Sequence, residues 1–137
     1  MTILANDRTT PKRTGNRLSL PVAAGALLYA GSIVCVNAAG FATRGATSNT
    51  LVAMGVAQQR VDNSVGVDGA LRVEVEANGA WLMANSASTD QITLAQVGSQ
   101  CFLVDDQTVA KTNGGATRSA AGWVVDVDAS GVWVRFR

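Results

Sequence analysis

Apolar and polar residues alternate along the segment LRVEVE at residues 71–76. A period of two is the pattern of a β-strand with one buried face. The Asn78-Gly79 pair that follows predicts a tight hairpin, because a type I′ turn needs positive φ at both central residues. With Ala77 opposite Ala80, the strand at 71–76 pairs with residues 81–85 and the two apolar faces coincide.

This register places two large side chains on the charged face of the predicted hairpin. Trp81 lies opposite Glu76, and Met83 lies opposite Glu74. Trp and Met are enriched in interface cores, so we expect Trp81 and Met83 to be candidate contacts with a partner. An exposed aromatic without a partner and a second packing layer are the alternatives.

Short apolar runs separated by Gly- and Asn-rich turns fill most of the remaining sequence. We expect a strand, a turn at NAAG and a returning strand within residues 31–45, and a longer strand within 49–64 that bends at Gly55. Residues 88–100 accommodate one short helical turn, capped by Thr89 or Asp90 and ended by Gly98.

The C-terminal segments AAGWVVDVD and GVWVRFR predict a final pair of strands. Trp123 shares one expected face with Val125 and Val127, and Trp133 lies between the buried positions of the last strand, which makes Trp133 a third candidate partner contact. Loops of two or three residues both fit the sequence after Asp128, and the register of this pair stays open.

About eight to ten short strands with almost no helix predict a compact all-β fold, a small barrel or sandwich, over residues 20–137. The protein, at 137 residues, has the length of one domain. Its 47% hydrophobic and 15% charged residues exclude wholesale disorder. Without an apolar run of about 20 residues, we expect no membrane association, and the polar N-terminus makes export unexpected.

Residues 1–19 predict a flexible, basic N-terminal arm. Arg8, Lys12, Arg13 and Arg17 stand against Asp7 alone, a net charge of +3, whereas the remaining residues together carry −2. The four basic residues are candidate contacts with an acidic groove or with nucleic acid. The arm has no interleaved aromatic residues, which disfavours single-stranded nucleic acid, and a solvated tail without a partner is the alternative.

The sequence offers no residue set for catalysis. It has no histidine, which excludes Cys–His and Ser–His–Asp nucleophiles. Cys35 and Cys101 lie in apolar runs 66 positions apart, so we expect two buried, unpaired thiols and neither a zinc site nor a disulfide framework.

Two polar stretches could be mistaken for chemical sites. The segment CFLVDDQTVAKT, residues 101–112, sets a thiol, two carboxylates and a lysine close together, but its composition predicts a strand, a turn and a strand. The segment VDNSVGVDG, residues 61–69, has calcium-like oxygen spacing without the closing glutamate, and we expect a surface loop. We therefore predict no enzyme activity, no cofactor and no metal.

Three stretches carry a resemblance to a known family: AGALLYAGSIVCVNAAGFATRGAT, LVAMGVAQQRVDNSVGVDGALRVEVE and QCFLVDDQTVAKTNGGATRSAAGWVVDVDASGVWV. In strand lengths and turns they resemble the capsid decoration, or cement, proteins of tailed bacteriophages and prophages. The resemblance covers about residues 20–137.

The resemblance implies a β domain, often a homotrimer, that is made in the bacterial host cytoplasm and binds the outer surface of the virion head. It implies bridging of neighbouring major capsid protein subunits, stabilisation of the shell, no catalytic residues and no direct contact with nucleic acid. Another virion component, such as a head fibre or tail part, and a small nucleic-acid-binding or ligand-binding β-barrel are the alternatives.

Overall fold

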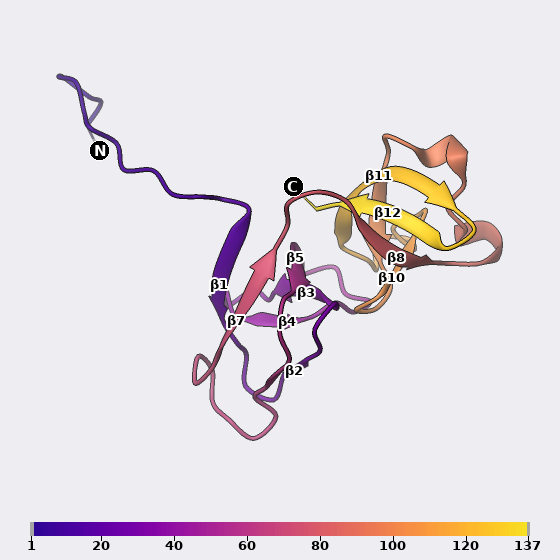
Figure 1. Ribbon diagram of the computed structural model, residues 1–137, viewed down its shortest axis with the longest axis horizontal. Coiled ribbons are helices and arrows are strands. Elements are labelled where there is room, and N and C mark those ends of the chain that lie inside the picture. The colour runs from indigo at the N-terminus through magenta and orange to yellow at the C-terminus, as the bar shows by residue number, and fades with distance from the viewer. Residues whose placement is uncertain (1, 137) are drawn as a thin grey trace.

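The computed structural model describes residues 2–136, and nearly all of its regular structure is β-strand (Figure 1). The predicted all-β fold with a small barrel is confirmed. The described residues contain twelve strands, more than the eight to ten expected, and two short 3₁₀ turns.

The N-terminal half of the protein forms a curled sheet. In their order across the sheet, its strands are β1 (Arg17–Pro21), β7 (Arg72–Glu76), β5 (Val52–Ala57), β3 (Ile33–Val36) and β4 (Ala42–Arg44). A parallel bridge joins Val22, directly after β1, to Ala42 of β4. This bridge brings the two edges of the sheet together, so the sheet encloses a core of its own. A ribbon of β2 (Leu27–Leu28) and β6 (Val61–Asp62) adds to that core.

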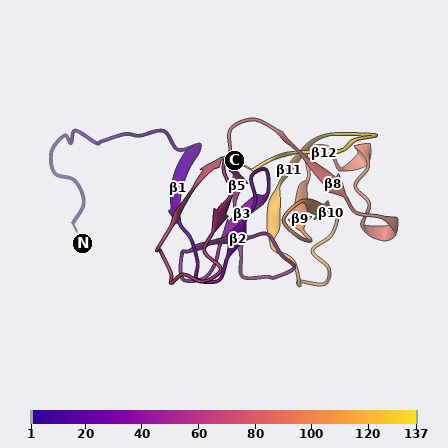
Figure 2. The same cartoon turned by 60° about the horizontal axis from the view of Figure 1, so that its bottom comes forward.

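The C-terminal half forms a closed five-stranded barrel. Its strands, in order around the barrel, are β10 (Thr108–Ala110), β8 (Trp81–Asn85), β12 (Gly131–Arg135), β11 (Ala120–Asp128) and β9 (Gln100–Leu103). All five strands come from residues 81–135, which we call the barrel lobe, and residues 17–76 form the sheet lobe. The backbone passes between the two lobes at residues 77–80, the crossing segment (Figures 1 and 2).

Strand β3 joins the two lobes through their cores. Ile33 and Cys35 pack into the core shared with the barrel, whereas Val34 points into the core of the sheet lobe, and all three are fully buried. A strand covered on both faces needs no alternation, which explains the unbroken apolar run. Each fully buried Val or Ile contributes about 1.5–3 kcal/mol, so β3 holds the lobes together.

The predicted bend at Gly55 is confirmed. The pairing of β5 with β3 shifts between Ala53 and Gly55, which marks a bulge, and Gly55 has φ +145°. A Cβ at this position would lie 2.5 Å from the carbonyl oxygen of Glu76. Glycine is therefore required by both the backbone conformation and the close approach of β7.

The predicted hairpin through Asn78-Gly79 is wrong. Strand β7 pairs with β1 and β5, while β8 pairs with β12 and β10, so the two segments belong to different lobes. Gly79 has φ +81°, but Asn78 is not among the residues with positive φ, and a type I′ turn needs both. Asn78 and Gly79 therefore form a bend within the crossing segment and do not close a hairpin.

The boundary predicted for the arm, after residue 19, is also wrong. Strand β1 begins at Arg17, and the carbonyl oxygen of Asn16 already accepts a hydrogen bond from Ala77 N–H at 2.8 Å. Leu18 and Leu20 lie opposite Val75 and Val73, so they supply the apolar cross-strand partners that the predicted hairpin assigned to β8.

The C-terminal strands form a hairpin with a two-residue loop, which settles the open register. Asp128 pairs with Gly131, and Asp128 Oδ1 accepts a hydrogen bond from Ser130 N–H at 2.7 Å. The pairing shifts between Val124 and Asp126, so Val125 is the extra residue of a β-bulge.

The predicted helical turn is present as two short 3₁₀ turns, η1 (Ser88–Asp90) and η2 (Leu94–Gln96). Asp90 lies within η1, and neither Thr89 nor Asp90 is a cap. The cap belongs to Thr93, whose hydroxyl accepts from Ala95 N–H while the Gln96 side chain bonds back to Thr93. Gly98, with φ +85°, follows the second turn as predicted.

Candidate interaction surfaces

The N-terminal arm is exposed along its described length, residues 2–15, and contains no strand (Figure 1). Arg8, Lys12 and Arg13 are exposed and make no ion pair with the described residues. Arg17, the fourth predicted contact, belongs to the body instead, because it lies in β1 and its Nη2 is 3.1 Å from Glu74 Oε2. Three of the four predicted basic residues are therefore presented by the arm.

A groove lies where the arm meets the body. It has a volume of about 240 Å³ and is lined by residues of the arm and of β1, with Arg72 from β7. The Arg72 guanidinium donates to the hydroxyl and the carbonyl oxygen of Ser19, at 3.0 and 2.7 Å. Over Arg17–Pro21 the strand β1 pairs only with β7 among the described residues, and the bridge to β4 begins after its end, at Val22.

The interface role predicted for Met83 is wrong, and the side chain of Trp81 is also directed toward the barrel core. Met83 is buried in the barrel core, and the half-buried Trp81 packs against that core. Trp81 Nε1 has no hydrogen-bond partner among the described residues. The two side chains do not share a face with Glu74 and Glu76, because β7 and β8 are unpaired. Their inward position follows from the pairing of β8 with β12.

Trp133 does lie on the outside of the barrel, as part of a face that the sequence did not reveal. It pairs with Leu82 of β8, and two residues further along β12 Arg135 pairs with Trp123 of β11. We call these four residues, Leu82, Trp123, Trp133 and Arg135, the outer barrel face. Leu82 and Trp123 are each 42% exposed. Trp and Arg are the residue types that most often dominate binding energy at interfaces.

The bulge at Val125 explains why the sequence pattern did not identify Trp123 as an exposed residue. Sequence alternation placed Trp123, Val125 and Val127 on one face, but the extra residue changes the phase, and Val124 is buried instead while Trp123 and Val125 are exposed. Beside Trp123, an apolar groove of about 290 Å³ is lined by residues that include Val52 and Phe136.

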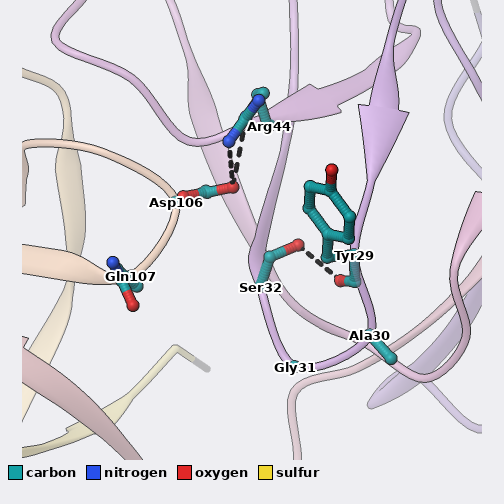
Figure 3. A pocket seen from close by; sticks show the side chains of 7 residues that line it. All are labelled: Tyr29, Ala30, Gly31, Ser32, Arg44, Asp106 and Gln107. Carbon is teal, nitrogen blue, oxygen red and sulfur yellow. Dashed lines mark hydrogen bonds and ion pairs between the residues drawn. The ribbon is translucent and has the colours of Figure 1, made fainter. Parts of the chain in front are cut away.

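A third hollow, a polar cavity, lies between the lobes (Figure 3). It has a volume of about 310 Å³ and is lined by Tyr29, Ala30, Gly31, Ser32, Arg44, Asp106 and Gln107. Arg44 Nε and Nη2 both donate to Asp106 Oδ2, at 3.1 and 2.8 Å, and tie β4 to the β9–β10 turn. The Asp106 backbone carbonyl accepts from Ile33 N–H at 2.7 Å. These contacts make the cavity wall a junction between the lobes.

The segment at residues 101–112 is a strand, a turn and a strand, as predicted. Asp105 Oδ1 accepts from the N–H groups of Gln107 and Thr108, at 2.9 and 2.8 Å, which is the hydrogen bonding of a side-chain-supported turn. Cys101 is buried, and Asp106 is paired with Arg44. The thiol and the two carboxylates therefore serve separate structural roles.

The loop at residues 61–69 uses its oxygens to support the backbone. Asp62 Oδ1 accepts from Ser64 N–H and Oγ–H, and these hydrogen bonds lower the pKa of Asp62. Asp68 Oδ1 accepts from Ala24 N–H at 2.7 Å. Within the described residues, no three His, Cys, Asp or Glu side chains gather in a metal-binding arrangement.

Both cysteines are buried and unpaired, as predicted. Burial raises the pKa of Cys35 to about 12 and that of Cys101 to about 11. Because the thiolate is the reactive form, both thiols are expected to resist iodoacetamide at neutral pH in the folded protein and to react in denaturant. Peptide mapping after labelling measures this, and rapid labelling of either cysteine in the folded protein would contradict it.

Comparison with protein-family models, with curated proteins and with solved structures identified no match. No helix among the described residues has the length and apolarity that crossing a bilayer requires.

Proposed function

We propose that this protein is a capsid decoration, or cement, protein of a tailed bacteriophage or prophage. In this role it is made in the bacterial cytoplasm, binds the outer surface of the icosahedral head and bridges neighbouring major capsid protein subunits. The observation that carries the proposal is the exposed basic arm, which continues directly into β1, the first strand in the order of the sheet. The body behind it is a β structure whose two lobes share a core. The resemblance in strand lengths and turns supports the same role.

The arm is the main attachment element in this proposal. An extended segment that continues an edge strand can add a strand to an exposed sheet edge of a capsid subunit, where backbone hydrogen bonds supply affinity. Arg8, Lys12 and Arg13 favour an acidic surface and speed the encounter with it. A homotrimer would present three arms together, and avidity would then hold the protein to the shell through individually weak contacts.

The outer barrel face supplies the second contact, with a neighbouring copy or with the shell. Its two tryptophans and Arg135 have the composition of an interface core. A structural role also agrees with the use of the candidate chemical groups, because the cysteines are buried and Asp105 and Asp106 stabilise a turn and an ion pair. We therefore propose no catalytic activity.

Quantitative mass spectrometry of purified particles from the source strain tests the proposal. A ratio near one copy of this protein for each major capsid protein would support cement over the whole lattice. A few copies in each particle would support another virion component, such as a head fibre or a tail part. Absence from the particles would overturn both, and would favour a binding barrel.

Removal of residues 2–15 is expected to weaken binding to shells by about a hundredfold or more, because each attachment loses its arm and the avidity of the assembly falls steeply. The truncation keeps Asn16 and Arg17, which bond to Ala77 and Glu74, so the thermal unfolding curve is expected to be unchanged. Co-sedimentation with shells measures binding. A full-length control with Arg8, Lys12 and Arg13 changed to glutamine separates the charge from the added strand.

Unchanged shell binding by the truncated protein would contradict an attachment role for the arm. Nucleic-acid binding is the competing function, since Arg13, Arg17 and Arg72 line the groove at the base of the arm. It predicts affinity for nucleic acid that falls steeply with salt. The same purified protein, titrated with duplex and single-stranded DNA at two salt concentrations, distinguishes the two functions.

A further inference from the structure

The crossing segment contains an exposed Asn-Gly pair, Asn78-Gly79. Both residues lie in a bend outside the strands, between the end of β7 and the start of β8 (Figure 1). Gly79 has φ +81°, and no atom beyond its two chain neighbours lies within 4 Å of the place that a Cβ would occupy. Both residues are exposed, so no other part of the described protein crowds this bend.

We propose that Asn78 is a site of spontaneous modification by water, through a succinimide. The backbone nitrogen of Gly79 attacks Cγ of Asn78, a new N–C bond closes a five-membered ring, and the bond between Cγ and Nδ2 of Asn78 breaks. The proton from the Gly79 nitrogen leaves with the amide nitrogen as ammonia. Water then opens the ring at either carbonyl, which gives aspartate or isoaspartate at position 78, with no oxidant or reductant required.

The geometry at Asn78 permits this reaction because no hydrogen bond from the described residues restrains the two reacting groups. The side-chain amide of Asn78 and the N–H of Gly79 have no hydrogen-bond partner among residues 2–136. The bend can therefore rearrange to bring the nitrogen to Cγ without the loss of a strand or of a buried contact. Glycine also presents no side chain against the closing ring.

A second Asn-Gly pair in the same protein, Asn113-Gly114, is held in place and supplies an internal control. Asn113 Oδ1 accepts from Ala116 N–H at 3.2 Å, and the Asn113 carbonyl accepts from the N–H groups of Thr117 and Arg118 at 3.0 Å. Gly114 N–H, the group that would attack, donates to Thr112 Oγ1 at 3.4 Å. Ring closure at Asn113 requires these hydrogen bonds to break first.

The reaction would alter the connection between the lobes. Either product adds a negative charge to the crossing segment, and isoaspartate also adds one carbon to the backbone there. Ala77, the residue before Asn78, is buried in the core that the two lobes share, and its N–H is bonded to Asn16. The modification would therefore change the backbone directly after Ala77, a residue that is held in the shared core.

Peptide mapping of the full-length folded protein, incubated for weeks at mildly alkaline pH, tests the proposal. Trypsin places the two sites in different peptides, residues 73–111 and 112–118. Fragment spectra locate the modified residue, and protein isoaspartyl methyltransferase detects isoaspartate. Because the hydrogen bonds at Asn113 raise its barrier, the rate at Asn78 is expected to exceed that at Asn113 by at least about tenfold.

Two controls keep the test decisive. In protein unfolded by urea the two rates are expected to converge, because both sites then are free Asn-Gly pairs. The variant Asn78→Gln is expected to leave the peptide 73–111 unmodified, which shows that Asn85, whose side chain bonds twice to Ile92, does not react. Equal rates at the two sites in the folded protein, or a faster rate at Asn113, would overturn the proposal.

Discussion

Replacement of Gly131 by alanine is expected to lower the free energy of unfolding by about 3 kcal/mol or more. Gly131 begins β12 and has φ +145°, a conformation that alanine rarely adopts. A Cβ there would overlap the backbone carbonyl oxygen of Met83 on the neighbouring strand β8. Because that carbonyl belongs to the closed barrel, it can move only if the barrel distorts.

A second glycine substitution gives the cost of positive φ without a close contact. Gly98 also has positive φ, +85°, but no atom lies within 4 Å of its missing Cβ. Gly98→Ala is therefore expected to cost about 1 kcal/mol, from the backbone conformation alone. Urea unfolding followed by tryptophan fluorescence measures both variants, and equal losses would show that the carbonyl of Met83 does not restrict position 131.

Asn63→Ala is expected to destabilise the sheet lobe by about 2–4 kcal/mol. Asn63 is 2% exposed, and its Nδ2 donates to the carbonyl oxygens of Val22, Ala23 and Val67 at 3.3, 3.0 and 2.9 Å. These bonds fix the segment after β1 to the loop at residues 61–69. Without the amide, all three of these hydrogen bonds are lost, although each carbonyl keeps a backbone N–H donor, from Gly69, Ala26 or Ala70. Urea unfolding measures the cost.

The variant Asn63→Asp keeps the shape of the side chain and changes its charge. A carboxylate oxygen would then face the three carbonyls in place of the amide hydrogens, so the pKa of Asp at this position is expected to be raised in the folded protein. The folded state then binds a proton more tightly than the unfolded state, whose Asp pKa is about 3.9. Relative to the unsubstituted protein, the variant is expected to lose stability as the pH rises above about 4, and a pH-independent difference would contradict this.

Local turns were predictable from the sequence, but strand partners were not. The turns at residues 37–40 and 105–108 form as expected, because one Asn or Asp side chain bonds to backbone N–H groups a few residues further along. The turn at Asn78-Gly79 failed because hairpin formation also depends on what else can pair with β7. Leu18 and Leu20, more than fifty residues earlier, cover Val73 and Val75, and no local pattern reports that competition.

The candidate surfaces were predicted in part. The exposure of Arg8, Lys12 and Arg13 follows from a segment with too few apolar residues to fold. Met83 was misplaced along with the false hairpin. Trp123 was placed on one face with Val127, but a single inserted residue in β11 puts the two on opposite faces. Gly122 next to Trp123, a glycine inside an otherwise apolar strand, is the signal that could have indicated an irregular strand.

The single passage between the lobes also determines the order in which the protein can fold during synthesis. Every strand of the sheet lobe precedes the crossing segment, so this lobe can close as soon as β7 has left the ribosome. At that moment Ile33, Cys35 and Val56 would form an uncovered apolar surface, since their partners in the core are barrel residues that follow later. The nascent polypeptide therefore exposes an aggregation-prone apolar surface until the residues of the barrel lobe have been added. Once the barrel has folded, it buries this surface.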